Sequence, residues 1–482
     1  MQLFFTDYRA VWRAGEVAGM SRSDLEDLFE RRPLPAGTPI LLDDQMRPIE
    51  PITSWGRDLA LDDFDPDTMR EYGYAAIRLL GYLVARGLDL ESASETDIKG
   101  YRQWRTGTSR RPVQKSTWEK EAAALTSLSR FLNRSGESTA GGWRLSKVTG
   151  RRVSRDMRVR HMELDQYLFF RDVGFGGLEP SGSVDVAFDG WRPHRNRAAC
   201  ELGLLTGMRI QEWSTLLLPE LGLLGGRRPR RTEVDLAACA KRQYPRTVYV
   251  PMDAMELLDP YLLLERPRMV AAAQRTLRRR CGDLFVVDRV EADGRRVSGV
   301  FEGHRVTWVV KMMDPGLRRL AVLETGDGLD PLAVFLGRGG SMLTPSGWDR
   351  ARWRAWDRMK AAAAGQPDGL LPGQCWVYHD LRHSFALRLL IFLTREALND
   401  IEAQELPMST LLDHMTGNPL LVVQQRLGHE SPSSTYKYIR YLKDPMADVD
   451  AAFREWTAAG GASYADIARE LMSLGGSGAS QG

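Results

Sequence analysis

A run of small and polar residues, SGESTAGG at 135–142, separates two regions of the chain that differ in pattern. Segments rich in Gly and Ser are flexible and often connect domains. The run therefore predicts a hinge, and we place a basic linker over 136–154. With 482 residues, the chain is long enough for two or more domains that each bury a core.

The region before the linker carries helical signals. Between 68 and 87, apolar residues recur at helical spacing, and Gly87 is placed to end the helix. Further helices are expected over 96–105 and after a capping box that starts at Ser116. We therefore predict a helical domain at 65–135, preceded at 1–64 by an acidic extension of unknown role.

After the linker, helical patterns alternate with short stretches typical of strands. The stretch RTVYVP at 246–251 is rich in β-branched and aromatic residues and predicts a β-hairpin. Residues 285–345 carry mixed signals and are interpreted as an insertion of uncertain structure. The expected fold class is mainly α, with a small sheet or hairpin in a mixed α/β domain at 155–445. C-terminal helices and a flexible tail are expected at 446–482.

Charge is distributed unevenly along the chain. Residues 1–98 carry a net charge of −9, residues 99–160 carry +12, and the remainder is balanced. Such a basic block attracts a polyanion such as DNA, although a solvated charged face explains it equally well. The candidate DNA-binding residues in and around the block are Arg110, Arg111, Lys115, Arg151, Arg152 and Arg155.

Several classes of protein are disfavoured by what the sequence lacks. It has no apolar run of the ~18 residues that span a membrane, and its first residues lack the apolar core of a signal peptide. We therefore expect a cytoplasmic protein without a membrane partner. Its four cysteines form no C-x-x-C pair, which predicts reduced, mostly buried thiols. Because motifs for metal or nucleotide binding are missing, no metal and no cofactor are expected.

Four short motifs place phosphate-compatible groups beside helix signals. In TGMRIQE at 206–212, Arg209 follows a glycine turn, and Glu212 is spaced to hold its guanidinium from behind. In HDLRHSFA at 379–386, His379 and Arg382 share one helical face. The other two are LGH, ending at His429, and SSTYKYIRY at 433–441. Taken singly, each motif also fits a surface arginine, a structural histidine or a core tyrosine.

In order and spacing these motifs resemble the tyrosine recombinase (phage integrase) family. Its pattern runs TG-x-R-x-x-E, H-x-x-R-H-[ST]-F-A, LGH and then a tyrosine nine residues past the last histidine, which is Tyr438 here. Tyr436 and Tyr441 lie close by, so the assignment rests on register. The motifs cover 155–445, and 65–135 resembles the family's helical core-DNA-binding domain less specifically. The resemblance implies that the two domains form a clamp around DNA.

The resemblance also implies how DNA would be cleaved. Tyr438 would attack a phosphate, form a 3′-phosphotyrosyl bond and release a 5′-hydroxyl, without metal or ATP. Because a tyrosine has an ordinary pKa of about 10, attack at neutral pH requires a base or a positive field. Arg209 and Arg382 would supply that field and stabilise the transition state.

The remaining roles go to histidines, a glutamate and a lysine. His379 and His429 would hydrogen-bond the same phosphate, with His379 the better acceptor for the tyrosine proton. Glu212 and His383 would support them. Lys241, beside the predicted hairpin, is the candidate that protonates the leaving hydroxyl, and a solvated hairpin lysine is an equally open interpretation.

Two spacings are longer than the family usually shows. Arg209 and His379 are 170 residues apart, and Arg382 and His429 are 47 apart, which implies insertions near 262–345 and 393–415. The first contains RTLRRR at 275–280, a candidate DNA contact. The second is acidic and is expected to face a protein or solvent.

The expected function is that of a site-specific recombinase, integrase or transposase of a mobile element. By resemblance it would act as a homotetramer on two DNA duplexes at specific sites, with accessory proteins as candidate partners. Residues 446–475 would dock on a neighbouring subunit or pack within their own. Two alternatives are a catalytically silent DNA-binding regulator and a type IB-like topoisomerase or telomere resolvase that uses the same cleavage step.

Overall fold

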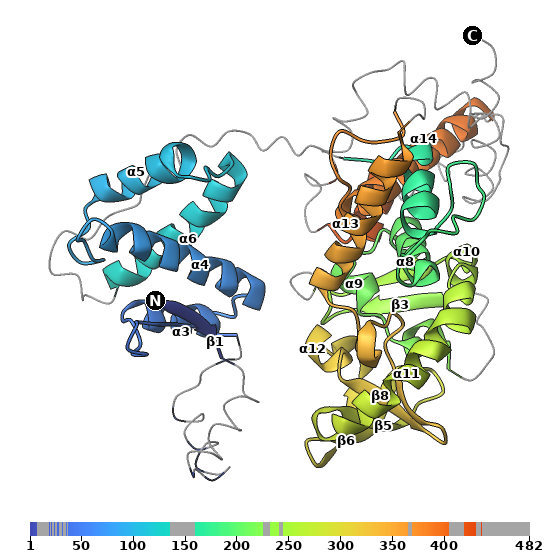
Figure 1. Cartoon of the computed structure of the whole chain (residues 1–482), viewed down its shortest axis with the longest axis horizontal. Helices are drawn as coiled ribbons and strands as arrows, with labels where there is room; N and C mark the ends of the chain where they lie inside the picture. The colour runs from blue at the N-terminus through green and yellow to red at the C-terminus, as the bar shows by residue number, and fades with distance from the viewer. Residues whose placement is uncertain are drawn as a thin grey trace. The chain divides into compact units, whose positions relative to one another are not determined.

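The computed structural model describes residues 1–6, 37–134, 160–224, 232–240, 244–364, 369–403 and 419–429, with a few single positions outside these ranges, among them Thr435. The chain divides into two compact units, Met1–Asp156 and Met157–Gly482 (Figure 1). The predicted linker at 136–154 and the predicted C-terminal segment at 446–482 lie outside the described residues. No described helix is long and apolar enough to span a bilayer.

In its described residues, the N-terminal unit is helical apart from one antiparallel pair of short strands. Its elements are β1 (Gln2–Phe5), β2 (Pro39–Leu42), α3 (Ile52–Leu61), α4 (Pro66–Val84), α5 (Glu95–Gln103), the π-helical turn η1 (Trp104–Thr108) and α6 (Lys115–Arg134). Asp65 caps α4 by accepting hydrogen bonds from the first turn. α6 begins one residue before the predicted cap, Ser116.

The boundary predicted at residue 64 is wrong, because segments on both sides of it share one core. Leu41 of β2 and Trp55 and Leu59 of α3 are buried with Leu79 of α4 and Leu125 of α6. The Trp55 indole N–H donates to Ser127 Oγ on α6 at 3.3 Å. The described parts of residues 1–64 are therefore built into the helical unit.

The part of the C-terminal unit that the structure describes is mainly helical and contains two separate sheets. Its first half comprises α7 (Leu164–Leu168), η2 (Phe169–Phe175), α8 (Pro193–Thr206), α9 (Ile210–Ser214), η3 (Leu218–Leu221), β3 (Thr232–Leu236), β4 (Arg246–Val250), α10 (Met252–Glu256), η5 (Tyr261–Glu265) and α11 (Arg266–Arg279). The second half comprises η6 (Cys281–Asp283), β5 (Phe285–Val290), β6 (Arg296–Phe301), β7 (His304–Val309), η7 (Val310–Met312), α12 (Pro315–Arg318), β8 (Ala321–Thr325), β9 (Gly328–Pro331), η8 (Arg338–Gly340), α13 (Pro345–Ala362), α14 (Tyr378–Ala403) and α16 (Pro419–Leu427).

The predicted fold class, mainly α with a small hairpin, is confirmed. β3 and β4 pair antiparallel with Val234 opposite Val248, and they bury alternate residues, as the sequence of 246–251 indicates. Between these strands, residues 241–243 lie outside the described part of the chain. The strand pair therefore positions Arg246, the first residue of β4, beside the helices that precede it.

The region 285–345, whose structure the sequence leaves uncertain, contains a five-stranded sheet in the order β7-β6-β5-β8-β9. Its pairs are antiparallel except β5 with β8. In Figure 1 this sheet lies at one end of the C-terminal unit and α14 at the other. α11 packs beside it through Ala273 and Leu277, which share a small core with Val322 and Leu329. The insertion is thus an ordered element.

Two smaller expectations are corrected. α14 continues without a break from the HDLRHSFA motif into the predicted insertion at 393–415, and residues 404–418 lie outside the described part. Of the four cysteines, which are all free, Cys281 is exposed and Cys375 is half-buried, so only Cys200 and Cys239 are buried thiols.

Candidate functional site

The first and second motifs are held together by a cluster of aromatic rings. Trp213 directly follows Glu212, and Tyr378 directly precedes His379. Their ring centroids are 5.4 Å apart in an edge-to-face contact, and Trp348 of α13 packs against both rings. Because all three side chains are buried, the start of α14 has a fixed position relative to α9.

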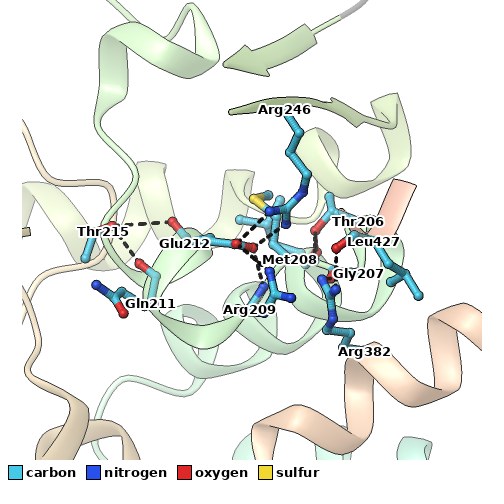
Figure 2. Close-up of polar contacts among 11 residues, drawn as sticks. Thr206, Gly207, Met208, Arg209, Gln211, Glu212, Thr215, Arg246, Arg382 and Leu427 are labelled. Atoms are coloured by element: carbon cyan, nitrogen blue, oxygen red, sulfur yellow. Dashed lines mark hydrogen bonds and ion pairs between the residues drawn. The ribbon is translucent and has the colours of Figure 1, made fainter. Parts of the chain in front are cut away.

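Glu212 is the centre of the site. It is 1% exposed and belongs to the first turn of α9. Its carboxylate accepts from the Arg209 backbone N–H at 2.6 Å and from Arg209 Nη1 at 3.2 Å, so the expected contact from behind is present. The Arg209 side chain stays 22% exposed. Figure 2 shows the two side chains in contact.

A second arginine, Arg246 of β4, binds the same carboxylate. Its Nη1 and Nη2 donate to Glu212 Oε1 and Oε2 at 2.8 and 2.5 Å, and its side chain is only 7% exposed (Figure 2). Paired N–H donors on one carboxylate fix both side chains. Burial raises the pKa of Glu212, but the hydrogen bonds and charges of Arg246 and Arg209 outweigh burial and hold that pKa below its ordinary value.

Sequence reasoning missed Arg246, the first residue of the stretch RTVYVP that predicts the hairpin. Nothing in RTVYVP distinguishes this arginine from an exposed strand residue. Its role depends on Glu212 of α9, which lies beside the start of β4. Tertiary packing brings these two elements together.

Two glycines of the motifs make room for side chains of other motifs. At Gly207 (φ +64°), a Cβ atom would lie 2.4 Å from Cδ1 of Phe385 on α14. At Gly428 (φ +59°), a Cβ atom would lie 2.6 Å from Arg246 Cδ. Both positions therefore require glycine for its positive φ and for the close approach.

Arg382 binds backbone carbonyls at or next to these glycines. Its Nη1 donates to the Gly207 carbonyl at 2.7 Å, and its Nη2 donates to the carbonyl of Leu427 at the end of α16. The residue is 1% exposed, so its charge is buried between α8 and α16. Arg382 thereby joins the first motif to the LGH motif (Figure 2).

Three histidines complete the cluster. His379 is exposed at the start of α14, and its ring meets that of the buried His383 edge-on, with centroids 4.6 Å apart. His429 Nδ1 shares a hydrogen bond with Thr435 Oγ1 at 3.0 Å. Thr435 is buried, and Tyr438 follows it by three residues in the sequence.

The electrostatics of the site keep two of these histidines neutral. Burial lowers the pKa of His429 to about 3, assisted by the positive charges of Arg382, Arg209 and Arg246. Burial and the neighbouring His379 likewise lower the pKa of His383 to about 3. At neutral pH the site therefore combines guanidinium charges with neutral imidazole rings, a set that suits a phosphate.

Several predicted site residues lie outside the described part of the chain. They are the candidate nucleophile Tyr438, its neighbours Tyr436 and Tyr441, the candidate acid Lys241, and the candidate DNA contacts Arg151, Arg152 and Arg155. The structure brings together Arg209, Glu212, Arg382, His379, His383 and His429.

The other DNA-binding candidates lie in the N-terminal unit. Arg110, Arg111 and Lys115 are exposed between η1 and the first residue of α6. Two other arginines of the basic block form ion pairs within the fold. Arg105 binds the buried Glu121, and Arg160 binds Asp380 at 3.0 Å. Asp380 is buried at the helix end, where it also accepts from the Val377 backbone N–H, and is not a surface group.

Comparison with known proteins gives matches among solved structures alone. No family model and no curated protein matches the sequence significantly. The chain is similar to XerH site-specific recombinase bound to a palindromic difH substrate (post-cleavage complex), with 16% identity, a TM-score of 0.45, and 80% of this chain and 78% of that one covered. It is also similar to the Tn1549 transposon integrase in complex with transposon right end DNA (12%, 0.42, 80% and 92%) and to XerA recombinase (15%, 0.29, 86% and 98%).

Proposed function

We propose that this chain is a tyrosine recombinase: a site-specific recombinase or integrase that cuts and rejoins DNA through a 3′-phosphotyrosyl intermediate. One observation carries the proposal. Three motifs spread over more than two hundred residues, with Thr435 of the fourth, contribute to one site that holds a buried carboxylate, arginines and two neutral histidines. A phosphodiester is the ligand that such donors fit.

In this proposal the partly exposed Arg209 makes the first contact with a non-bridging oxygen of the scissile phosphate. Glu212 fixes the direction of its guanidinium, and Arg246 binds the same carboxylate, so the three side chains together keep a net positive charge. The buried Arg382 adds positive charge beneath the same point, which stabilises negative charge that develops on the phosphate oxygens.

The chemical step is a transesterification. The Tyr438 oxygen forms a bond to phosphorus as the bond from phosphorus to the 5′-oxygen breaks. The phenolic proton passes to His379, the exposed imidazole, and Lys241 gives a proton to the leaving 5′-oxygen. Attack by a 5′-hydroxyl on the phosphotyrosine reverses the step and rejoins the strand, so the bond energy is conserved and ATP is not consumed.

The partners and setting follow from this chemistry. The substrate is double-stranded DNA at specific sites, and exchange between two duplexes calls for four active sites, hence a homotetramer. We expect the protein to act in the cytoplasm, where it would have access to DNA. Accessory proteins and a role for the C-terminal segment in contacts between subunits belong to the same proposal.

The test is a trapping experiment. Full-length protein is incubated with labelled, nicked duplexes from the flanks of its own gene and analysed by denaturing electrophoresis. We expect a protease-sensitive adduct with the wild type, Tyr436→Phe and Tyr441→Phe, and none with Tyr438→Phe. If Tyr438→Phe also forms the adduct, the nucleophile is misassigned.

Two further outcomes would contradict the proposal as a whole. DNA binding without any adduct would indicate a silent regulator. Relaxation of supercoiled plasmid without strand exchange between duplexes would indicate the type IB-like alternative.

A further inference from the structure

α11, in the insertion, carries a one-sided row of arginines. Arg268, Arg275 and Arg279 are exposed and are spaced by seven and four residues, so they lie on one face of the helix along ~16 Å. The small residues Ala271 and Ala272, both exposed, share this face. Arg278 and Arg280 are exposed beside it.

The opposite face of α11 is anchored. Met269, Ala273 and Leu277 are buried, and Gln274 exchanges hydrogen bonds with the Leu329 backbone of β9 at 2.9 and 3.1 Å. At the start of the helix, Arg266 binds Asp330 at 2.9 Å. The arginine row is therefore presented by a fixed element.

The row is not balanced by acidic residues of its own helix. Residues 266–280 contain no Asp or Glu. Arg275 and Arg279 are four residues apart, and like charges at this spacing destabilise a helix. By contrast, the β5–β6 hairpin nearby mixes its arginines with Asp288, Glu291 and Asp293. A surface whose charges repel one another fits a polyanionic partner better than it fits solvent.

The start of α11 is tied to the helix that leads to the candidate site. Glu265, the residue before α11, accepts from the backbone N–H groups of His194 and Arg195 at the start of α8, both at 3.1 Å. α8 has 14 residues and ends at Gly207 in the site, so its length of ~20 Å separates the two places. That length corresponds to about six base pairs of duplex.

We propose that the row formed by Arg268, Arg275 and Arg279 binds the phosphate backbone of duplex DNA that flanks the cleavage site. This inference rests on the proposed function and adds to it a DNA contact made by the insertion. Guanidinium contacts to phosphates are insensitive to sequence and release counterions, so their signature is the salt dependence of affinity.

The test compares two triple variants of the full-length chain on a labelled random-sequence duplex of about 40 base pairs, in about 50 to 200 mM salt. R268Q/R275Q/R279Q removes the row. R289Q/R295Q/R296Q removes the same charge from three exposed arginines of the β5–β6 hairpin. We expect the slope of log affinity against log salt to become shallower by about 2 to 3 in the first variant, and little change in the second.

The following outcomes would overturn the inference. An unchanged slope in the first variant assigns the row to solvent or to an acidic protein. If the slope becomes shallower by the same amount in both variants, the effect of the row is one of net charge and not of a specific contact. If the wild type binds no duplex, this inference and the proposed function fail together. If the wild type binds duplex and forms the Tyr438 adduct while the first variant keeps its slope, the inference alone fails.

Discussion

The side chain of Arg246 passes so close to Gly428 that a Cβ atom on that glycine would lie 2.6 Å from Arg246 Cδ. The same side chain ends on both oxygens of Glu212. Position 428 must therefore be glycine, because Arg246, which pairs with Glu212, occupies the space that a side chain there would need. Two motifs more than two hundred residues apart depend on one strand residue that belongs to neither.

We first predict that Gly428→Ala destabilises the C-terminal unit and disturbs the site. The positive φ alone costs an L-residue roughly 1–2 kcal/mol, and displacement of Arg246 from Glu212 adds to that cost. Gly87→Ala is the control, because Gly87 has a φ of +71° but nothing within 4 Å of its Cβ position. Urea unfolding should show a larger loss for Gly428→Ala, and equal losses would contradict the role given to Arg246.

We next predict that Arg246→Ala is severely destabilising. It leaves the carboxylate of Glu212 buried with Arg209 as its remaining described partner, and breaking a buried pair from one side typically costs 3–5 kcal/mol. Arg246→Lys keeps the charge without the two-point contact and should lose less. The double variant E212Q/R246A should be less destabilised than the sum of its parts. Additive losses in urea unfolding would argue against the pair.

Acid stability should depend on Glu212. Its pKa is lowered in the folded chain, with an ordinary value of 4.5, so its contribution to stability is present above about pH 4.5 and is lost as pH falls through the lower, folded pKa. Glu212→Gln should therefore flatten the decline in unfolding free energy below pH 4.5. A decline as steep as that of the wild type, followed by urea midpoints, would show that Glu212 is not held ionised.

The lowered pKa of His429 predicts a second pH range in which the stability of the fold changes. Because the folded pKa of His429 is about 3 and the ordinary value is 6.5, the unfolded chain binds more protons between these values, and stability decreases as pH falls from 6.5 towards 3. His429→Gln should reduce this slope. His304→Gln, on the exposed strand β7, serves as the matched control. Equal slopes for the two variants would mean that His429 is not kept neutral by its surroundings.

In the N-terminal unit, Trp55→Ala should cost about 3–5 kcal/mol, because Trp55 is buried between β2, α4 and α6. Leu61→Ala is the control on the same helix, since Leu61 is 52% exposed. The measurement is unfolding of the full chain followed by circular dichroism. Similar midpoints for the two variants would restore the interpretation of residues 1–64 as a separate extension.

The sequence predicted helices α4, α5 and α6 of the N-terminal unit, the hairpin at 246–251 and the contact of Arg209 with Glu212, because local periodicity and short spacing determine these features. It did not predict the five-stranded sheet, whose strands are short and are stabilised by pairing with other segments of the chain. Nor does any sequence pattern indicate that Asp380, at the start of α14, is buried against Arg160.

The sequence by itself identified the motif residues that the structure brings together, Arg209, Glu212, His379, Arg382, His383 and His429, since each motif carries its chemistry within a few positions. The tertiary structure decided what surrounds them. Burial makes two histidines neutral, and strand β4 supplies Arg246 as a second partner for Glu212. Such effects depend on distances between segments far apart in the chain, and no local pattern encodes them, because a charge or a close contact acts through space.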